Sequence, residues 1–220
     1  MEEADTGREM KKNYRNLGEF IQELEKKDEL IRFSLPVSNI LEITEIADRM
    51  SKLPGGGKAI LFENVTGYEY PVLMNQFGSI KRINMALGCE SLDDQAGRLQ
   101  KIINTKPPEF FKEKIKLLPQ LLKYSKYLPR TIKGKAPCQE IIKTGGDVDL
   151  GALPVLKCWP DDGGPFITLP VVFTRGLGDG KRNAGMYRMQ VYDRNTTGMH
   201  WHIHKDGAHH YNEYLKADRR

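Results

Sequence analysis

The 220-residue sequence predicts an α+β protein in two parts: an α/β domain with a basic connector over residues 1–125, then a β-rich domain over residues 126–220. Three observations predict this division. Helix-like and strand-like apolar spacings alternate in the first part, prolines and basic residues crowd the middle, and strand-like segments separated by turn residues fill the rest. Hydrophobic residues make up 39% of the chain, which is enough for a packed core and excludes general disorder.

The first part is expected to alternate helices with strands. Leu17, Phe20, Ile21 and Leu24 recur at helical spacing after Asn16, a residue type that caps helix N-termini. Further helices are expected over residues 41–50, 80–87 and 91–103, the last with a capping box of Ser91 and Asp94, and strands over residues 30–35, 59–62 and 70–74. Such alternation predicts layers of helices against a sheet.

The basic connector covers residues 106–135, which hold nine basic and two acidic residues and four prolines. Its aromatic residues have the spacing of core positions, so a solvated basic face explains the segment better than a surface on which nucleic-acid bases stack. The whole chain has a formal charge of +5, which suits anionic ligands without requiring nucleic acid. We therefore expect no nucleic-acid partner.

Beyond residue 136 the sequence predicts strands over residues 140–143, 166–175, 184–192 and 199–204, followed by a helix over residues 208–217. A small barrel or sandwich would close such strands. The final helix has only begun when the chain stops, so this β-domain is expected to be unfinished.

All five histidines fall within residues 200–210, interspersed with Trp201, Ile203 and Tyr211, which indicates a folded segment and not a tag. Residues 182–190 and 199–204 predict a hairpin. Strand alternation would place Arg188, Gln190 and Tyr192 on one face, and His200, His202 and His204 on one face of the partner strand. The hairpin would thus bring imidazoles close to a guanidinium.

A metal ion at this hairpin would need ligands from elsewhere. Same-face positions on a strand lie about 6.5–7 Å apart, too far for three consecutive imidazoles to close on one ion. One imidazole with oxygen ligands favours a divalent ion such as Mn²⁺ or Mg²⁺. Asn183 would supply an amide oxygen, or it merely opens a turn; both interpretations stay open.

A phosphate site is expected where Lys205, Asp206 and Gly207 lead into the last helix, because a helix N-terminus presents free backbone N–H groups. Lys205 and Arg188 would add positive charge, and Arg188 can bind a carboxylate or phosphate through two N–H bonds. The paired carboxylates of Asp161 and Asp162 are better explained as a turn before a strand than as metal ligands.

The three cysteines, Cys89, Cys138 and Cys158, are odd in number and widely spaced, which excludes a fully paired disulfide framework and a CxxC metal ribbon. The sequence also lacks a run of about 18 apolar residues, and its start is acidic where a secretory signal is basic. We expect a cytoplasmic protein in a reducing compartment with no membrane span.

Several ordered motifs resemble the UbiD family of decarboxylases, which includes polyprenyl-hydroxybenzoate and hydroxyarylic acid enzymes. They are Met74–Ser79, Leu153-Pro154, Asp161–Thr168, Asn183–Gln190 and His200–Ala208. The resemblance implies that residues 126–220 form the N-terminal part of an incomplete flavin-binding split β-barrel. It further implies carboxy-lyase chemistry on an aromatic or α,β-unsaturated carboxylic acid such as a hydroxybenzoate. The implied cofactors are prenylated FMN, Mn²⁺ and K⁺. A flavin prenyltransferase would supply the flavin, and the complete enzyme would be a homo-oligomer.

Carried over by position, the resemblance makes Asn183 a metal ligand and Arg188 the catalytic residue that holds the substrate carboxylate. His202 is the second metal ligand, with His204 as the competing alignment. The cofactor-binding positions it implies are Met186, Tyr187, Arg188, His200, Trp201, His202, Lys205 and Asp206.

The sequence departs from the family in its length. In the family a metal-binding glutamate and the acidic residues that work with the arginine lie downstream of the position where this sequence stops. The chain is therefore expected to be an N-terminal fragment, a truncated gene product or one half of a split enzyme, active only with a C-terminal portion. The alternative is a non-catalytic fragment that binds flavin or metal.

Overall fold

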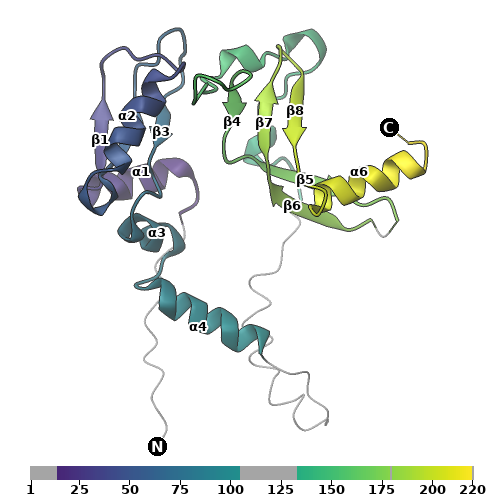
Figure 1. Ribbon diagram of the computed structural model, residues 1–220, viewed down its shortest axis with the longest axis horizontal. Helices are drawn as coiled ribbons and strands as arrows, with labels where there is room; N and C mark the ends of the chain where they lie inside the picture. The colour runs from purple at the N-terminus through teal and green to yellow at the C-terminus, as the bar shows by residue number, and fades with distance from the viewer. Residues whose placement is uncertain (1–13, 105–132, 179, 220) are drawn as a thin grey trace, which may run out of the picture.

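The computed structural model describes residues 14–104, 133–178 and 180–219. These residues form two groups of elements: a sheet with helices at the N-terminal end of the chain, and two small sheets with a helix at the other end (Figure 1). Helix α4 (Leu92–Ile103) extends away from both groups. Most of the predicted connector, residues 106–132, lies outside the described residues.

The N-terminal sheet has the order β1-β2-β3, with β1 parallel and β3 antiparallel to β2. Its elements are α1 (Leu17–Lys26), β1 (Leu30–Phe33), α2 (Glu42–Ser51), β2 (Ala59–Phe62), β3 (Val72–Met74) and α3 (Ile80–Leu87). Strand β2 is buried throughout because it is the central strand and has helices on both faces. The predicted alternation of helices and strands is confirmed here.

The two faces of β2 belong to two apolar clusters. Ala59 and Leu61 pack with Phe20 and Leu24 of α1, while Ile60 and Phe62 pack with Ile43 of α2 and the residues around it. Alternate residues of a strand point to opposite faces, so one four-residue strand serves both clusters. The result is a three-layer arrangement of helix, sheet and helix.

Side-chain caps define several helix starts. The Asn16 side chain accepts a hydrogen bond from the Glu19 backbone N–H at 2.9 Å, as its position in the sequence predicted. Ser91 also caps α4, but it accepts from the N–H of Asp93 and not of Asp94, so the expected capping box does not form.

The Met74–Ser79 motif has a structural explanation. Asn75 has a positive φ of 56° and donates hydrogen bonds to the carbonyls of Gly56 and Lys58. The fully buried guanidinium of Arg82 donates to the carbonyls of Gly56 and Asn75 and pairs with Glu29. A buried charge needs such partners, so packing explains this part of the resemblance.

The C-terminal group contains the sheets β4-β7-β8 and β5-β6 and one helix. Its elements are β4 (Phe166–Ile167), β5 (Val171–Arg175), β6 (Arg182–Met186), β7 (Arg188–Val191), β8 (Thr197–His200) and α6 (Asp206–Lys216). The mixed helix and sheet architecture is confirmed. The sheets are small and do not close into a barrel within the described residues, so the split barrel stays a prediction.

Four predicted strands need correction. Residues 140–143 form a bend followed by irregular backbone, between short 3₁₀ segments at Pro137–Gln139 and Gly145–Asp147. Residues 166–175 are divided where Leu169 adopts a positive φ of 57°, and residues 184–192 are divided at Tyr187. The strand expected over residues 199–204 ends at His200.

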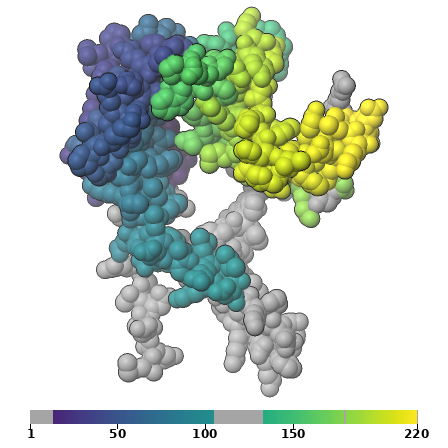
Figure 2. Space-filling model, viewed as in Figure 1, coloured from purple at the N-terminus to yellow at the C-terminus, as the bar shows by residue number. Residues whose placement is uncertain are grey.

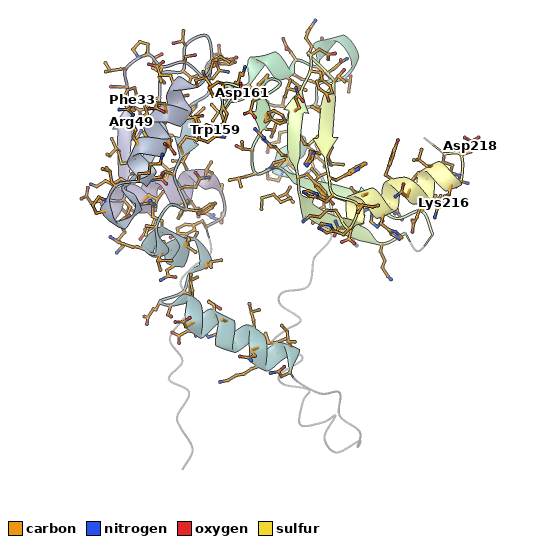
Figure 3. All side chains as sticks on the ribbon, in the orientation of Figure 1. Phe33, Arg49, Trp159, Asp161, Lys216 and Asp218 are labelled. Atoms are coloured by element: carbon orange, nitrogen blue, oxygen red, sulfur yellow. The ribbon has the colours of Figure 1, made fainter. Side chains whose placement is uncertain are left out.

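The two groups meet through residues 155–158. Leu156 is buried in the cluster that holds Val37 and Ile43, and Asn39 exchanges hydrogen bonds with the backbone of Val155 and Lys157. The space-filling view shows the two groups in contact along their upper part (Figure 2), and Trp159 and Asp161 lie where the chain passes between them (Figure 3). The predicted boundary at residues 125 and 126 falls outside the described residues and stays a prediction.

The described helices are all too short or too polar to cross a membrane.

Candidate functional site

A cavity of about 380 Å³ opens where the β7–β8 hairpin meets the start of α6. Seven of the eight predicted cofactor-binding residues line it. The full lining consists of Thr168, Leu169, Met186, Tyr187, Arg188, His200, Trp201, His202 and Lys205. The lining therefore combines apolar and aromatic side chains with cationic and imidazole groups.

The hairpin register brings Arg188 directly opposite His200. Residues paired across antiparallel strands lie within side-chain reach of each other, so the guanidinium and the imidazoles share one wall, as the sequence predicted. The chain then leaves the sheet at Trp201, whose indole packs against the ring of Tyr211 in α6, with centroids 5.3 Å apart.

The three alternate imidazoles lie closer together than strand spacing allows. Ring centroids are 5.3 Å apart for His200 and His202 and 5.6 Å apart for His202 and His204. The expected spacing of about 6.5–7 Å assumed a strand through His204. A turn replaces the strand after His200, with the Lys205 N–H bonded to the His202 carbonyl at 3.0 Å, and it folds the imidazoles toward one another.

Tyr187 fixes the start of α6 against β6. Its hydroxyl accepts a hydrogen bond from the Gly207 N–H at 2.9 Å, and its side chain is buried. The ring lies so close to Gly185 and Gly207 that a Cβ at either position would approach it within 3.0 Å. This close approach holds the helix N-terminus beside the cavity.

The Tyr187 hydroxyl occupies one of the backbone N–H groups at the start of α6, that of Gly207, and the N-cap side chain occupies none. Lys205 occupies the N-cap position and makes no capping hydrogen bond through its side chain. An uncapped helix N-terminus beside a lysine is a favourable place for a phosphate. The helix itself begins at Asp206, two residues earlier than predicted.

A carboxylate at the second turn of α6 ties the helix to the loop after β5. Glu213 accepts hydrogen bonds from the backbone N–H groups of Leu177 at 2.7 Å and Gly178 at 3.4 Å. The hydrogen bond from Leu177 is the main reason that the pKa of Glu213 lies below its ordinary value. The imidazole of His210 also contacts β5, with Nδ1 at 2.9 Å from the Thr174 hydroxyl.

The Arg188 guanidinium has a carboxylate partner that sequence reasoning assigned to a turn. Its Nη2 donates to both oxygens of Asp162, at 2.9 and 2.8 Å. The guanidinium carbon also lies 3.8 Å from the centre of the Phe166 ring. Arg188 is thus held from two directions at the wall of the cavity.

Three predicted or competing site residues do not line the cavity. Asn183 lies on β6, paired with Thr174, Asp206 is the first residue of α6, and the exposed His204 stacks on His202. Among the described residues, no three histidine, cysteine or acidic side chains converge on a point where they would hold a metal ion. The structure therefore gathers the expected cofactor positions but not a full set of metal ligands.

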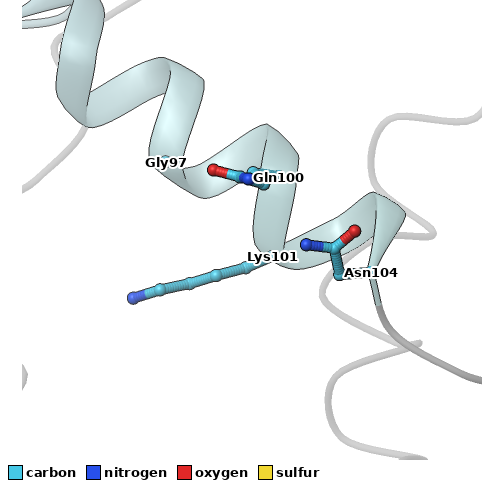
Figure 4. A pocket seen from close by; sticks show the side chains of 4 residues that line it. All are labelled: Gly97, Gln100, Lys101 and Asn104. Atoms are coloured by element: carbon cyan, nitrogen blue, oxygen red, sulfur yellow. The ribbon is translucent and has the colours of Figure 1, made fainter.

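A second hollow, of about 440 Å³, lies against one face of α4 and is lined by Gly97, Gln100, Lys101 and Asn104. Lys101 extends away from the amides of Gln100 and Asn104 (Figure 4). Without an aromatic wall or converging charges, this lining is less suited to a specific ligand than the hairpin cavity.

Sequence reasoning missed three residues of the site. Thr168 and Leu169 line the cavity because the positive φ of Leu169 ends β4 beside it. Asp162 reaches Arg188 because β4 pairs with β7 and carries the preceding turn to the guanidinium. If the pairing of β4 with β7 had been inferred from the sequence, it would have placed Asp162 near Arg188. The residues of the turn itself do not indicate that contact.

Two domain models of one family match the chain. The 3-octaprenyl-4-hydroxybenzoate carboxy-lyase N-terminal domain matches residues 21–102, and the Rift-related domain of the same carboxy-lyase matches residues 130–220. An uncharacterized protein of Aquifex aeolicus is 51% identical over 90% of this chain, and one of Archaeoglobus fulgidus is 47% identical over 90%. The chain spans 40% of the length of each of these relatives.

Solved structures agree with the domain matches. The vanillic acid decarboxylase of Sedimentibacter hydroxybenzoicus in its open form is 27% identical with a TM-score of 0.73, and the match covers 94% of this chain and 41% of that one. An evolved dimeric form of the UbiD-class enzyme HmfF from Pelotomaculum thermopropionicum, in complex with prFMN, shares the fold with a TM-score of 0.71 at 24% identity. That match covers 94% of this chain and 42% of the other.

Proposed function

The chain belongs to the UbiD family, and on that basis we propose that it supplies the flavin-binding part of a carboxy-lyase acting on an aromatic or α,β-unsaturated carboxylic acid. The single observation that carries the proposal is the cavity beside the hairpin. It combines apolar and aromatic surface with Arg188, Lys205 and the N-terminus of α6. An aromatic cofactor with a phosphate tail needs both kinds of surface.

In this proposal, different cavity residues bind different parts of the cofactor. Met186, Tyr187 and Trp201 would pack against the flavin rings and exclude water from them. Lys205 and the first N–H groups of α6, apart from that of Gly207, would bind the phosphate, with His200, His202 and Asp206 beside it. Prenylated FMN, when bound, would supply an electron sink for loss of CO₂ from the acid.

Arg188 would bind the substrate carboxylate through its guanidinium N–H groups. A guanidinium offers planar, paired donors that match a carboxylate, whereas lysine offers a compact point charge. Arg188→Lys is therefore expected to weaken binding of a carboxylate ligand by about tenfold while the melting temperature changes little. Carboxylate affinity of the variant equal to that of the wild type would contradict this role.

The residues present fit a divalent cation only in part. Asn183 and His202, or His204 in place of His202, would supply an amide oxygen and one imidazole. Among the described residues, no three histidine, cysteine or acidic side chains form a group that could hold a metal ion. Further ligands, for Mn²⁺ and for K⁺ alike, would have to come from additional polypeptide, and no step proposed here depends on the metal.

This chain spans 40% of the length of each of the two relatives. Activity, substrate and homo-oligomeric state are proposed for the assembled enzyme. The same applies to supply of the flavin by a prenyltransferase and to residence in the cytoplasm.

Two measurements test the function. The isolated chain should bind FMN, measured by quenching of flavin fluorescence, and Trp201→Ala should weaken this binding more than Trp159→Ala. Trp159 is the control because it is the other tryptophan and does not line the cavity. The chain combined with the C-terminal portion of a relative and prenylated FMN should then release CO₂ from 4-hydroxybenzoate or a related acid.

The outcomes separate the alternatives. Absence of FMN binding by the chain would overturn the proposal. Tight FMN binding without CO₂ release from any acid in the assembled mixture would favour a non-catalytic flavin-binding module.

A further inference from the structure

The ion pair between Asp162 and Arg188 lies at the wall of the cavity. Asp162 is 11% exposed and Arg188 is 44% exposed, so the carboxylate is the more buried partner. Only Nη2 of the guanidinium bonds to it. Among the described residues Asp162 is the only hydrogen-bond partner of that guanidinium, so Nε and Nη1 keep their N–H groups for another anion.

The backbone around Asp162 is fixed from several sides. Its N–H donates to the carbonyl of Trp159 at 3.2 Å, and its Oδ2 accepts from the Trp159 N–H at 3.2 Å. Four residues later, Phe166 pairs with Gln190 of β7 and donates its N–H to the carbonyl of Leu156 in the N-terminal core. The carboxylate is thus anchored to both groups of elements.

Phe166 restrains the guanidinium from a second direction. The guanidinium carbon stands 3.8 Å from the ring centre, within the range of a cation–π contact. An exposed arginine samples many rotamers, and binding a ligand with it costs the entropy of fixing one of them. The aspartate and the ring together remove that freedom before any ligand arrives.

We propose that Asp162 is a positioning residue that holds the Arg188 guanidinium at the cavity wall, ready to receive the carboxylate of a ligand. The inference rests on the proposed function, because that function makes Arg188 the carboxylate-binding group. It extends the function by assigning a role to a side chain that the sequence alone places in a turn. Asp162 would act on the ligand only through Arg188.

Asp161 provides a matched control. It is the neighbouring carboxylate in the same turn, it is exposed, and it forms no ion pair with a described residue. Asp161→Asn and Asp162→Asn remove the same charge from adjacent positions. Any difference between the two variants therefore reports the contact with Arg188 and not the net charge of the loop.

The first test measures the order of the Arg188 side chain in the free chain by ¹⁵N relaxation of its Nε–H group. Asp162→Asn is expected to lower the order parameter to about 0.6 or below, the range of flexible groups. Asp161→Asn should leave it unchanged, and Asp162→Glu should restore part of it. An order parameter unaffected by Asp162→Asn would overturn the inference, whatever the chain binds.

The second test uses the FMN-loaded chain and calorimetric titration with 4-hydroxybenzoate, with 4-hydroxybenzamide as the probe that lacks the carboxylate. Asp162→Asn should weaken binding of the acid by about three- to tenfold, the scale of fixing one long side chain, and leave the amide unaffected. Asp161→Asn should change neither affinity. An unchanged or increased affinity for the acid in Asp162→Asn would show that Asp162 does not position Arg188, or competes for it.

The two proposals can fail separately. FMN affinity should stay within about twofold of the wild type in Asp162→Asn, because Asp162 itself does not line the cavity. If the wild-type chain does not bind FMN, the proposed function fails, while the Arg188 order parameter still decides whether Asp162 positions the guanidinium.

Discussion

At the scale of single residues, close packing around Tyr187 decides the geometry of the cavity. Its hydroxyl holds the Gly207 N–H, and its ring occupies the space that a side chain at position 185 or 207 would need. Glycine is therefore required at these positions by a neighbouring side chain and not by backbone conformation, since neither glycine has a positive φ.

Gly207→Ala tests this packing. Alanine ordinarily stabilises a helix interior by about 0.5–1 kcal/mol relative to glycine. Here the new Cβ would lie 2.7 Å from the Tyr187 hydroxyl, so we expect a net loss of stability and weaker FMN binding. Gly97→Ala in α4 is the control, because nothing lies within 4 Å of its Cβ, and it should stabilise the chain. Thermal unfolding and flavin titration measure both effects, and a stabilised Gly207→Ala would contradict the packing argument.

At the scale of elements, α6 depends on a charged contact with the loop after β5. Glu213 must be ionised to accept fully from the Leu177 and Gly178 N–H groups, and these bonds lower its pKa. A lowered pKa in the folded chain means that the contact stabilises the fold above the ordinary value of 4.5. The stabilisation is then lost as the pH falls below that value and through the pKa of the folded chain.

Hydrogen exchange of the Leu177 amide should follow this titration. We expect its protection to fall as the pH is lowered from about 7 to about 3, after correction for the intrinsic exchange rate. Glu213→Gln should have lower protection at neutral pH and a flatter pH dependence. The same pH dependence in both proteins would show that another group controls the contact.

At the scale of the whole molecule, residues 155–158 join two groups that the sequence assigned to separate domains. Leu156 is 5% exposed and belongs to the N-terminal core, although its neighbours in sequence lead into β4. Packing across this junction couples the stability of the C-terminal group, which contains the cavity, to that of the layered N-terminal group.

Leu156→Ala tests that coupling. Replacing a buried leucine with alanine lowers the free energy of unfolding by about 2–5 kcal/mol. Here the substitution weakens the packing at the junction. We expect urea unfolding to lose cooperativity, with the C-terminal group unfolding before the N-terminal one. Leu153→Ala, at a residue that is 42% exposed in the same segment, should have little effect. A single cooperative transition with unchanged midpoint in Leu156→Ala would contradict the coupling.

The sheet of β5 and β6 also has an exposed apolar face. Val171, Phe173 and Met186 are 61%, 73% and 62% exposed, and the register sets Val171 opposite Met186 and Phe173 opposite Ala184. A contiguous apolar face of this kind favours association.

Phe173→Thr should reduce self-association, measured by sedimentation, without lowering the melting temperature, because threonine suits a strand and the side chain is not in the core. Ile203→Thr is the control, since Ile203 is 88% exposed but does not lie in this sheet. Equal effects of the two substitutions would show that the sheet face has no special role.

The sequence by itself determined the layered N-terminal domain and seven of the residues that line the cavity. Local periodicity predicts α1, β2 and α3, and the short connection between β7 and β8 brings Arg188 opposite His200, with Lys205 soon after in the chain. Such features depend on neighbours in sequence, and these are visible in the chain.

Tertiary structure alone decided where the strands end and which side chains from different elements come into contact. Asp162 reaches Arg188 through the β4–β7 pairing, and Leu156 joins a core whose other buried residues lie within residues 37–65. Packing of Trp201 on Tyr211 accompanies the exit of the imidazole segment from its strand. These contacts join residues far apart in the chain or in different elements. Their energies depend on the assembled fold, so no local pattern in the sequence contains them.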